Sequence, residues 1–201
     1  MAKVITLSLC VEKHVVSRVF HVLQKGFMVN ARVGCSINEF LCHQQNLSPA
    51  YIAQKIKTIF LDGQPVDDID SAVIQDGCTV ALSGAMPGLV GAVMRRGSAY
   101  ASFRHSITYK KANSDSQRKP GMVRLKLFNI VMDDLGLEFL EKGFFISPRD
   151  LTDVLENQSP EFWQGCKEIK LNEKPVKTDF LKDGQLALHG DLVFFSVKIL
   201  M

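Results

Sequence analysis

The residues that could carry chemistry in this chain are scattered. Its five cysteines form no Cys-x-x-Cys pair and its five histidines show no metal-ligand spacing, so we expect neither a disulfide framework nor a zinc site. Cys42 and His43 are adjacent, and on a helix they would point about 100° apart, so they cannot pair directly as nucleophile and base. A core or surface thiol is the simpler interpretation of Cys42, with a nucleophile as the alternative. Asp67-Asp68 and Asp133-Asp134 are typical of turns or helix starts rather than of acid–base catalysis.

We therefore predict no catalytic residues, no metal and no cofactor. The motivating observation is that packing signals are abundant while no set of reactive side chains converges. An enzyme would require a cleft between domains, lined with polar groups, that the sequence does not reveal.

A glycine-rich apolar stretch is the first candidate for binding. Glycines at positions 84, 88, 91 and 97 lack the Lys-Ser/Thr of a P-loop and do not fit Gly-x-Gly-x-x-Gly, so a phosphate cradle is not indicated. We expect a linker or a short apolar helix here. Alternatively, the stretch docks onto another domain or subunit, where small residues permit close approach. This partner-binding tail comprises Gly84, Met86, Pro87, Gly88, Leu89 and Gly91.

A basic stretch follows the glycines. Residues 95–126 hold nine of the 24 Lys and Arg residues but only Asp115 of the 21 acids, whereas the remaining residues carry 15 bases and 20 acids. Interleaved aromatics (Tyr100, Phe103 and Tyr109) would suit single-stranded nucleic acid, which pairs phosphates with cations and stacks its bases. The favoured interpretation is a solvated connector over 95–120, although Ser98–Tyr109 alternates well enough to be a strand. The candidate anion-binding residues are Arg95, Arg96, Arg104, Lys110 and Lys111.

The totals describe an ordinary globular chain. Its 201 residues allow one large domain or two of about 100 residues each, and 46% hydrophobic content is enough for a core. No apolar run reaches the roughly 18 residues of a membrane span, and no signal-peptide core is complete at the N-terminus. We expect a cytoplasmic protein that does not bind membranes.

The sequence repeats itself. Alternation at Ile5, Leu7, Leu9 and Val11 predicts a strand with one buried face, and it returns at Val123, Leu125 and Leu127. Lys25-Gly26-Phe27 matches Lys142-Gly143-Phe144, where glycine suits a helix stop. Ser36 and Ser48 match Ser147 and Ser159 as helix caps, and Pro65-Val66 matches Pro175-Val176. The spacing is 118 residues at the first strand, 117 at the glycines, 111 at both caps and 110 at the prolines.

Collinear matches whose spacing changes only between elements indicate a duplicated domain. The first half ends with a turn at Asp76-Gly77 and an apolar strand, Val80–Ser83. Its counterpart is His189-Gly190 followed by Val193–Ser196, with Asp183-Gly184 as the alternative turn. Helices between only some of the strands exclude a parallel doubly wound sheet and favour a mixed sheet with one helix packed across it.

The order of elements, with Leu61-Asp-Gly-Gln-Pro-Val66 and Asp76-Gly-Cys-Thr-Val-Ala-Leu82, resembles the ubiquitin-like β-grasp fold. The nearest relatives within it would be the sulfur-carrier proteins of molybdopterin and thiamine biosynthesis. The resemblance implies an α+β fold of two tandem β-grasp domains, at residues 1–94 and 121–201, joined by the connector at 95–120. Carrier chemistry in that family needs a C-terminal glycine, whereas this chain ends Lys198-Ile-Leu-Met201; only cleavage after Gly88 or Gly91 would supply one.

These observations favour a non-enzymatic binding or scaffolding protein, which offers sheet faces, sheet edges or the glycine-rich tail to another protein or to a second copy of itself. One alternative is an accessory of sulfur-carrier or cofactor biosynthesis that binds an adenylating enzyme. Another is a nucleic-acid binder, whose affinity would fall steeply with salt.

Overall fold

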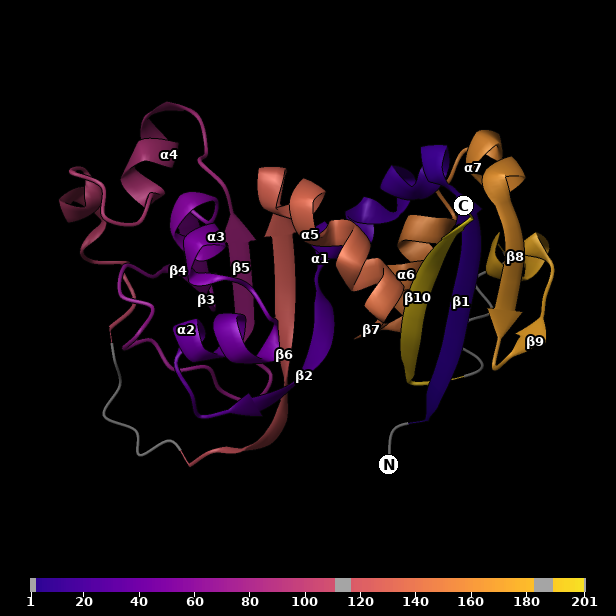
Figure 1. The fold of residues 1–201 in the computed structure, drawn as a ribbon, viewed down its shortest axis with the longest axis horizontal. Helices are drawn as coiled ribbons and strands as arrows, with labels where there is room; N and C mark the ends of the chain where they lie inside the picture. Colours follow the sequence, from indigo (N-terminus) through magenta and orange to yellow (C-terminus); the bar gives the residue numbers. More distant parts are fainter. Residues whose placement is uncertain (1–2, 111–116, 183–189, 201) are drawn as a thin grey trace. The chain divides into compact units, whose positions relative to one another are not determined.

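The computed structural model describes residues 3–110, 117–182 and 190–200, and it has a mixed α+β fold (Figure 1). The chain divides into two compact units. One unit is continuous, Met28–Asp133, and is called the inserted unit below. The other combines Met1–Phe27 with Asp134–Met201 and is called the terminal unit.

The inserted unit contains five strands in the order β4-β3-β5-β6-β2. β3 is antiparallel to β4 on one side and to β5 on the other, and β5 is parallel to β6. The sheet is therefore mixed, with its parallel pair in the interior. The strands are β2 (Phe27–Val33), β3 (Thr58–Leu61), β4 (Gln64–Pro65), β5 (Thr79–Ser83) and β6 (Lys119–Phe128).

The terminal unit also contains five strands, in the order β7-β10-β1-β8-β9. β1 is parallel to β10 over its whole length, from Val4 beside Leu192 to Glu12 beside Leu200 (indigo and yellow in Figure 1). β1 is antiparallel to β8, and β10 is antiparallel to β7. The strands are β1 (Val4–Glu12), β7 (Phe144–Ile146), β8 (Cys166–Leu171), β9 (Lys174–Pro175) and β10 (Leu192–Leu200).

The two long strands that open the halves of the sequence lie in the opposite units. β1 begins the first half of the chain, yet it pairs with β8 and β10 from the second half. β6 begins the second half, yet it pairs with β5 from the first half. The domain boundaries predicted from the sequence follow chain order, whereas the compact units exchange these strands. The predicted boundaries divide the chain into two sequence repeats, and they stay a prediction. The two compact units are groups of residues that pack together.

Strand formation follows from the alternation of buried and less buried residues. In β1, Ile5, Leu7, Leu9 and Val11 are buried, and in β6 Val123, Leu125 and Leu127 are buried, so both strand predictions are confirmed. Phe27 and Phe144 pack in the core of the terminal unit, with ring centroids 4.4 Å apart. The glycines that precede them, Gly26 and Gly143, have φ of 107° and 79°, as predicted for helix stops.

Serine caps open the helices at the predicted places. The hydroxyl oxygens of Ser36 and Ser147 accept hydrogen bonds from the backbone N–H three residues later, and those of Ser48 and Ser159 do the same. The helical segments of the inserted unit are α2 (Ile37–Glu39), η2 (Phe40–Gln44), α3 (Pro49–Gln54), α4 (Gly88–Met94) and η3 (Ala101–Arg104). Those of the terminal unit are η1 (Lys13–Phe20), α1 (His21–Lys25), α6 (Pro148–Leu155), α7 (Pro160–Gly165) and α8 (Thr178–Lys182), and α5 (Asn129–Lys142) contains the unit boundary.

Two local predictions are not confirmed, one because it is wrong and one because it is not tested. The strand suggested by alternation over Ser98–Tyr109 is wrong, because the segment forms turns and the 3₁₀ helix η3. Its backbone turns where the Ser98 hydroxyl accepts a hydrogen bond from Tyr100 N and where Arg104 enters a buried ion pair. Both turns proposed before the last strand, at Asp183-Gly184 and His189-Gly190, fall wholly or partly outside the described residues.

The short outer strands β4 and β9 are poor sites for strand addition. Each ends in a proline, Pro65 or Pro175, which has no N–H to offer a neighbouring strand. The carbonyl of Pro65 already accepts a hydrogen bond from Tyr109 N at 2.9 Å. Binding by sheet extension is therefore disfavoured at these two strands, so the sheet faces and the loops are better candidates for a binding surface. Among the residues described, no helix combines the length and the apolar character needed to cross a membrane.

Two glycines in the inserted unit allow a direct test of its packing. Gly34 and Gly63 have φ of +84° and +80°, but a Cβ on Gly34 would lie 2.6 Å from the Gln117 carbonyl oxygen while one on Gly63 would meet nothing within 4 Å. We expect Gly34→Ala to lower the free energy of unfolding by about 2–4 kcal/mol, through backbone strain plus a backbone clash. Gly63→Ala, the matched control, should cost only about 1–2 kcal/mol from the strain.

The measurement is urea unfolding of both full-length variants, followed by circular dichroism. Equal losses in the two variants would contradict the close approach of Gln117 to the end of β2.

Candidate functional site

The predicted partner-binding tail leaves β5 as a tightly packed turn followed by a helix. Gly84 is buried, and a Cβ there would lie 2.5 Å from Ile130 Cγ2. Gly91 lies in α4, where a Cβ would lie 2.1 Å from the Met86 carbonyl oxygen. These two glycines are small for architectural reasons. Pro87 and Gly88 are exposed at the start of α4, and Met86 is half-buried, so the expectation of a short apolar helix is confirmed.

The outer side of this segment carries exposed apolar side chains. Leu89 and Val90 on α4 are 71% and 69% exposed, and Phe103 on η3 is 75% exposed. The rings of Tyr100 and Phe103 lie 6.3 Å apart and almost parallel, with an interplanar angle of 17°. α4 and η3 contact each other. The 89–107 surface is defined by five residues that are each about half exposed or more: Leu89, Val90, Tyr100, Phe103 and Ile107.

Arg104 holds this surface in place. Its side chain is 1% exposed and forms a bidentate ion pair with Asp67, in which Nη2 lies 2.6 Å from Oδ1 and Nη1 lies 3.0 Å from Oδ2. Nε donates to the Val93 carbonyl at 2.7 Å, Nη1 to the Thr108 hydroxyl at 2.8 Å, and Nη2 to the Arg95 carbonyl at 3.4 Å. All five N–H groups of the guanidinium are therefore used, which is the condition for burying such a cation.

Backbone hydrogen bonds fix the ends of the same segment to the sheet. Arg96 N donates to the Lys57 carbonyl at 2.9 Å, next to the start of β3, and Tyr109 N donates to Pro65 in β4. Gly97 N donates to Asp67 Oδ1 at 3.3 Å. Residues 96–109 are thus attached at both ends and through Arg104. This arrangement displays the 89–107 surface on a supported loop rather than on a free connector.

The predicted anion-binding residues separate in the structure. Arg104 is internal, and its charge is met by Asp67. Arg95 and Lys110 are exposed, Arg96 is half-buried, and Lys111 lies outside the described residues. Partial burial lowers the pKa of the Arg96 guanidinium, which nevertheless stays a cation at neutral pH. Anion binding by the remaining cations stays a prediction, with Arg104 as its structural support rather than as a ligand.

The sequence did not identify Asp67 as the partner of Arg104. Asp67-Asp68 was assigned to a turn, and Asp68 Oδ1 does accept hydrogen bonds from the N–H groups of Asp70 and Ser71. Asp67 lies 37 positions before Arg104, and no periodic pattern joins the two. Opposite charge was the only available signal, and many pairs in this chain share it.

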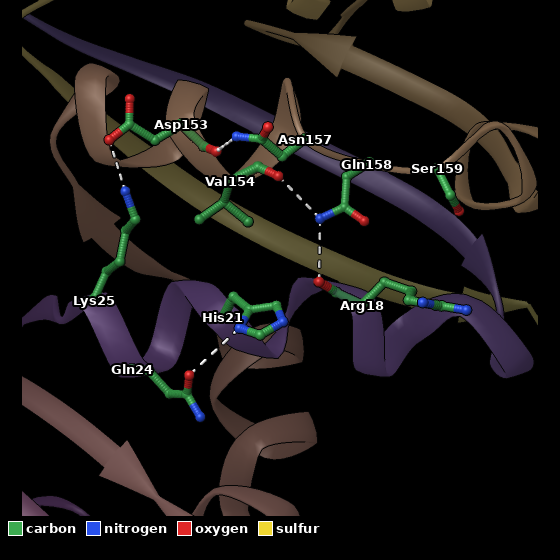
Figure 2. A pocket seen from close by; sticks show the side chains of 9 residues that line it. All are labelled: Arg18, His21, Gln24, Lys25, Asp153, Val154, Asn157, Gln158 and Ser159. Carbon is green, nitrogen blue, oxygen red and sulfur yellow. Dashed lines mark hydrogen bonds and ion pairs between the residues drawn. The ribbon is translucent and has the colours of Figure 1, made fainter.

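A polar groove of about 540 Å³ lies in the terminal unit (Figure 2). Lys25 Nζ lies 2.7 Å from Asp153 Oδ2, and this hydrogen bond lowers the pKa of the Asp153 carboxyl. Gln158 Nε2 donates to the carbonyls of Arg18 and Val154. The groove is lined by Arg18, His21, Gln24, Lys25, Asp153, Val154, Asn157, Gln158 and Ser159.

The polar groups of this groove largely satisfy one another. Asn157 Nδ2 donates to the Asp153 carbonyl at 2.7 Å, His21 Nδ1 lies 3.4 Å from Gln24 Oε1, and the Ser159 hydroxyl accepts from Phe162 N at the start of α7. Figure 2 shows that two other bonds cross the groove, from Lys25 to Asp153 and from Gln158 to the Arg18 carbonyl. The groove is best explained as part of the packing interface between η1, α1 and α6 within the terminal unit, rather than as a ligand site.

Cys42 and His43 line a different cavity, of about 480 Å³, with Asn38, Glu39 and Arg118 among its other residues. Cys42 Sγ donates to Asn38 Oδ1 at 3.3 Å, and Glu39 pairs with Arg118 at 2.7 Å. No thiol–imidazole hydrogen bond is found between the described residues here, so the geometry does not support an activated nucleophile.

Two other cysteines, Cys35 and Cys78, are poor candidates for a nucleophile. Burial raises the pKa of the Cys78 thiol to about 11 and also raises that of Cys35, which disfavours the reactive thiolate. Over residues 3–110, 117–182 and 190–200, no cluster of three or more His, Cys, Asp or Glu side chains could hold a metal ion. Comparison with protein-family models, curated proteins and solved structures finds no match to this chain.

Arg104 provides the test of how the 89–107 surface is supported. We expect Arg104→Ala to lower the free energy of unfolding by about 2–3 kcal/mol. This is below the usual cost of breaking a fully buried pair because Asp67, whose side chain is 36% exposed, can be rehydrated. Amide hydrogens of Arg96, Gly97 and Tyr109 should exchange faster in the variant, as measured by NMR.

Arg95→Ala is the matched control, because the Arg95 side chain is exposed and its loss should change stability by less than about 0.5 kcal/mol. Arg104→Lys should fall between the two, since an ammonium keeps the charge and loses the planar fork. If Arg104→Ala matched Arg95→Ala in both readouts, the proposed supporting role of Arg104 would be wrong.

Proposed function

We propose that this protein is a non-enzymatic protein-binding protein that engages its partner through the 89–107 surface. The proposal rests on the exposure of Leu89, Val90 and Phe103. They lie on a segment that is held in place by the buried ion pair of Arg104 with Asp67. Exposed apolar side chains on a supported surface are typical of interaction sites, because a partner gains their burial without first ordering the loop.

The charge around the surface indicates what kind of partner fits it. Residues 84–110 contain four Lys or Arg and no Asp or Glu. Asp67 pairs with Arg104, and Asp67 and Asp70 also attract Arg96, so the exposed Arg95 and Lys110 contribute most of the positive charge of this segment. A partner segment that combines apolar anchors with acidic residues would match both the side chains and the charge.

A protein partner is favoured over nucleic acid by the makeup of the surface. Three of its five residues, Leu89, Val90 and Ile107, are aliphatic and offer no stacking platform for bases. Arg104, one of the cations that the nucleic-acid interpretation relied on, is internal. The Tyr100–Phe103 pair is the feature that both interpretations share.

We also infer a β-grasp origin for the two units. The support is that each unit has a five-stranded sheet in which a strand (β2 or β7) is followed by helices, a further strand (β3 or β8), a very short strand (β4 or β9) and a last long strand (β5 or β10). In this proposal the two repeats exchange their first strands. β1, from the first repeat, lies in the terminal unit, and β6, from the second repeat, lies in the inserted unit. The remaining strands follow one another in the order expected from the sequence, whereas α5 and α8 are additional to the one main helix expected in each domain.

The partner proposal is tested by selecting peptides from a random displayed library against the full-length protein. Selected peptides should carry apolar anchors with flanking Asp or Glu. Leu89→Ser and Phe103→Ser should each weaken their binding by about tenfold or more, as expected for loss of a buried anchor. Val4→Ser, which changes an exposed apolar residue in β1 (49% exposed), serves as the control and should leave binding unchanged.

Peptides that bind the Leu89 and Phe103 variants as well as the wild type would overturn the proposal. So would tight binding of a single-stranded oligonucleotide that is lost with added salt and with Arg95→Ala and Arg96→Ala, because counterion release would then identify nucleic acid as the ligand.

A further inference from the structure

A second feature of the inserted unit is a hollow on the outer face of its sheet. In β5, Val80 and Leu82 are buried on the core side, while Thr79 and Ala81 alternate with them toward the other face. A cavity of about 430 Å³ lies there, well within the range of small-molecule sites. It is lined by Phe60, Gly63, Thr79, Ala81, Ser83, Met86, Lys126, Phe128 and Asn129.

The strand register explains why this face is hollow. Ala81 lies between Phe60 of β3 and Lys126 of β6, which are its partners on the two sides. Side chains directly opposite one another on neighbouring strands share a face. A methyl group therefore stands between two long side chains and leaves the space above it empty. Ser83 beside Phe128 closes one end of this row.

The charge in the hollow is unbalanced. Lys126 is the one ionisable group among the nine lining residues, and none of the nine is acidic. Within the described part of the chain the Lys126 ammonium has no ion pair or hydrogen bond, and Lys126 is half-buried. A partly buried cation without a counter-charge attracts an anion, because water compensates it less well than it would a fully exposed cation.

Asn129 adds a second polar group at the edge of the hollow. It has a left-handed backbone, with φ of 54°, and its Nδ2 donates to the Ser83 hydroxyl at 3.1 Å. Asparagine tolerates this conformation better than most residues. The side-chain amide is thus held in place by Ser83, and its oxygen remains a further acceptor for a ligand hydroxyl or amide.

We propose that this hollow binds a small amphipathic organic carboxylate, with its apolar body against Ala81, Phe60 and Phe128 and its carboxylate at Lys126. The apolar floor excludes a bare inorganic anion as the best ligand, since it would leave that surface unused. The cation and the absence of acidic lining residues exclude amines. The site is separate from the 89–107 surface, none of whose residues lines it.

The test uses decanoate below its micelle-forming concentration, and its uncharged counterpart decanol below its solubility limit. Titration of the isotope-labelled full-length protein should shift the amide resonances of Thr79, Ala81, Ser83 and Lys126 with decanoate, and binding should be weaker with decanol. Lys126→Gln should weaken decanoate binding by about 10- to 100-fold, as expected for loss of a charge-assisted hydrogen bond, and should hardly change decanol binding.

Two further variants complete the test. Ala81→Leu fills the hollow and should abolish binding of both probes. If that variant fails to fold, Lys126→Gln decides alone. Lys174→Gln, in the exposed strand β9 of the terminal unit, is the matched control and should bind decanoate as the wild type does.

Absence of decanoate binding at millimolar concentration, shifts confined to other residues, or equal affinity of the wild type and Lys126→Gln would each overturn the proposal. Leu89→Ser and Phe103→Ser should leave decanoate binding intact, so failure of this site and failure of the partner proposal can be told apart.

Discussion

The parallel pairing of β5 with β6 is the constraint on which the inserted unit depends. β5 pairs with β3 along one edge. Along its other edge it needs a second strand, which satisfies its backbone hydrogen bonds and places apolar side chains beside Val80 and Leu82. The strand that does this, β6, comes from the second half of the sequence. β1 does the corresponding work in the terminal unit, where it lies between β10 and β8. Each unit is therefore complete only with a strand from the other half.

Both candidate sites depend on that pairing. β6 contributes Lys126 and Phe128 to the sheet-face hollow, and its register against β5 places Lys126 beside Ala81. The 84–110 segment begins where β5 ends, at Gly84 packed against Ile130 just beyond β6. Arg104 and Asp67 then hold the segment against the β3–β4 side of the sheet. A small hollow and a supported apolar surface thus arise from one sheet, without a converging set of catalytic groups among the described residues.

Much of the local structure could be predicted from the sequence, because local signals determine it. Alternation at Ile5–Val11 and Val123–Leu127 predicted strands, and the serines at 36, 48, 147 and 159 predicted helix starts. These features depend on neighbours within a few residues. The tail helix at Gly88–Met94 was predicted for the same reason.

What the sequence could not supply is pairing across distance. β1 and β6 have the same alternation, so nothing local decides which of them lies beside β5 or β10. Alternation over Ser98–Tyr109 was misleading, because the ion pair of Arg104 with the distant Asp67 determines that segment. The hollow at Ala81 could not be foreseen either, since it exists only in the register that places Phe60 and Lys126 on both sides of a methyl group.

The exchange of strands is tested most directly by comparing two fragments, residues 28–133 and residues 1–94, for cooperative thermal unfolding and amide dispersion by NMR. The first contains β3 to β6 and all of β2 except Phe27, and the second contains β1 to β5 without β6. We expect fragment 28–133 to fold cooperatively and fragment 1–94 not to, because β5 in the shorter fragment lacks its parallel neighbour β6. A 1–94 fragment as well folded as 28–133, or better, would contradict it and would favour two repeats that each fold in chain order.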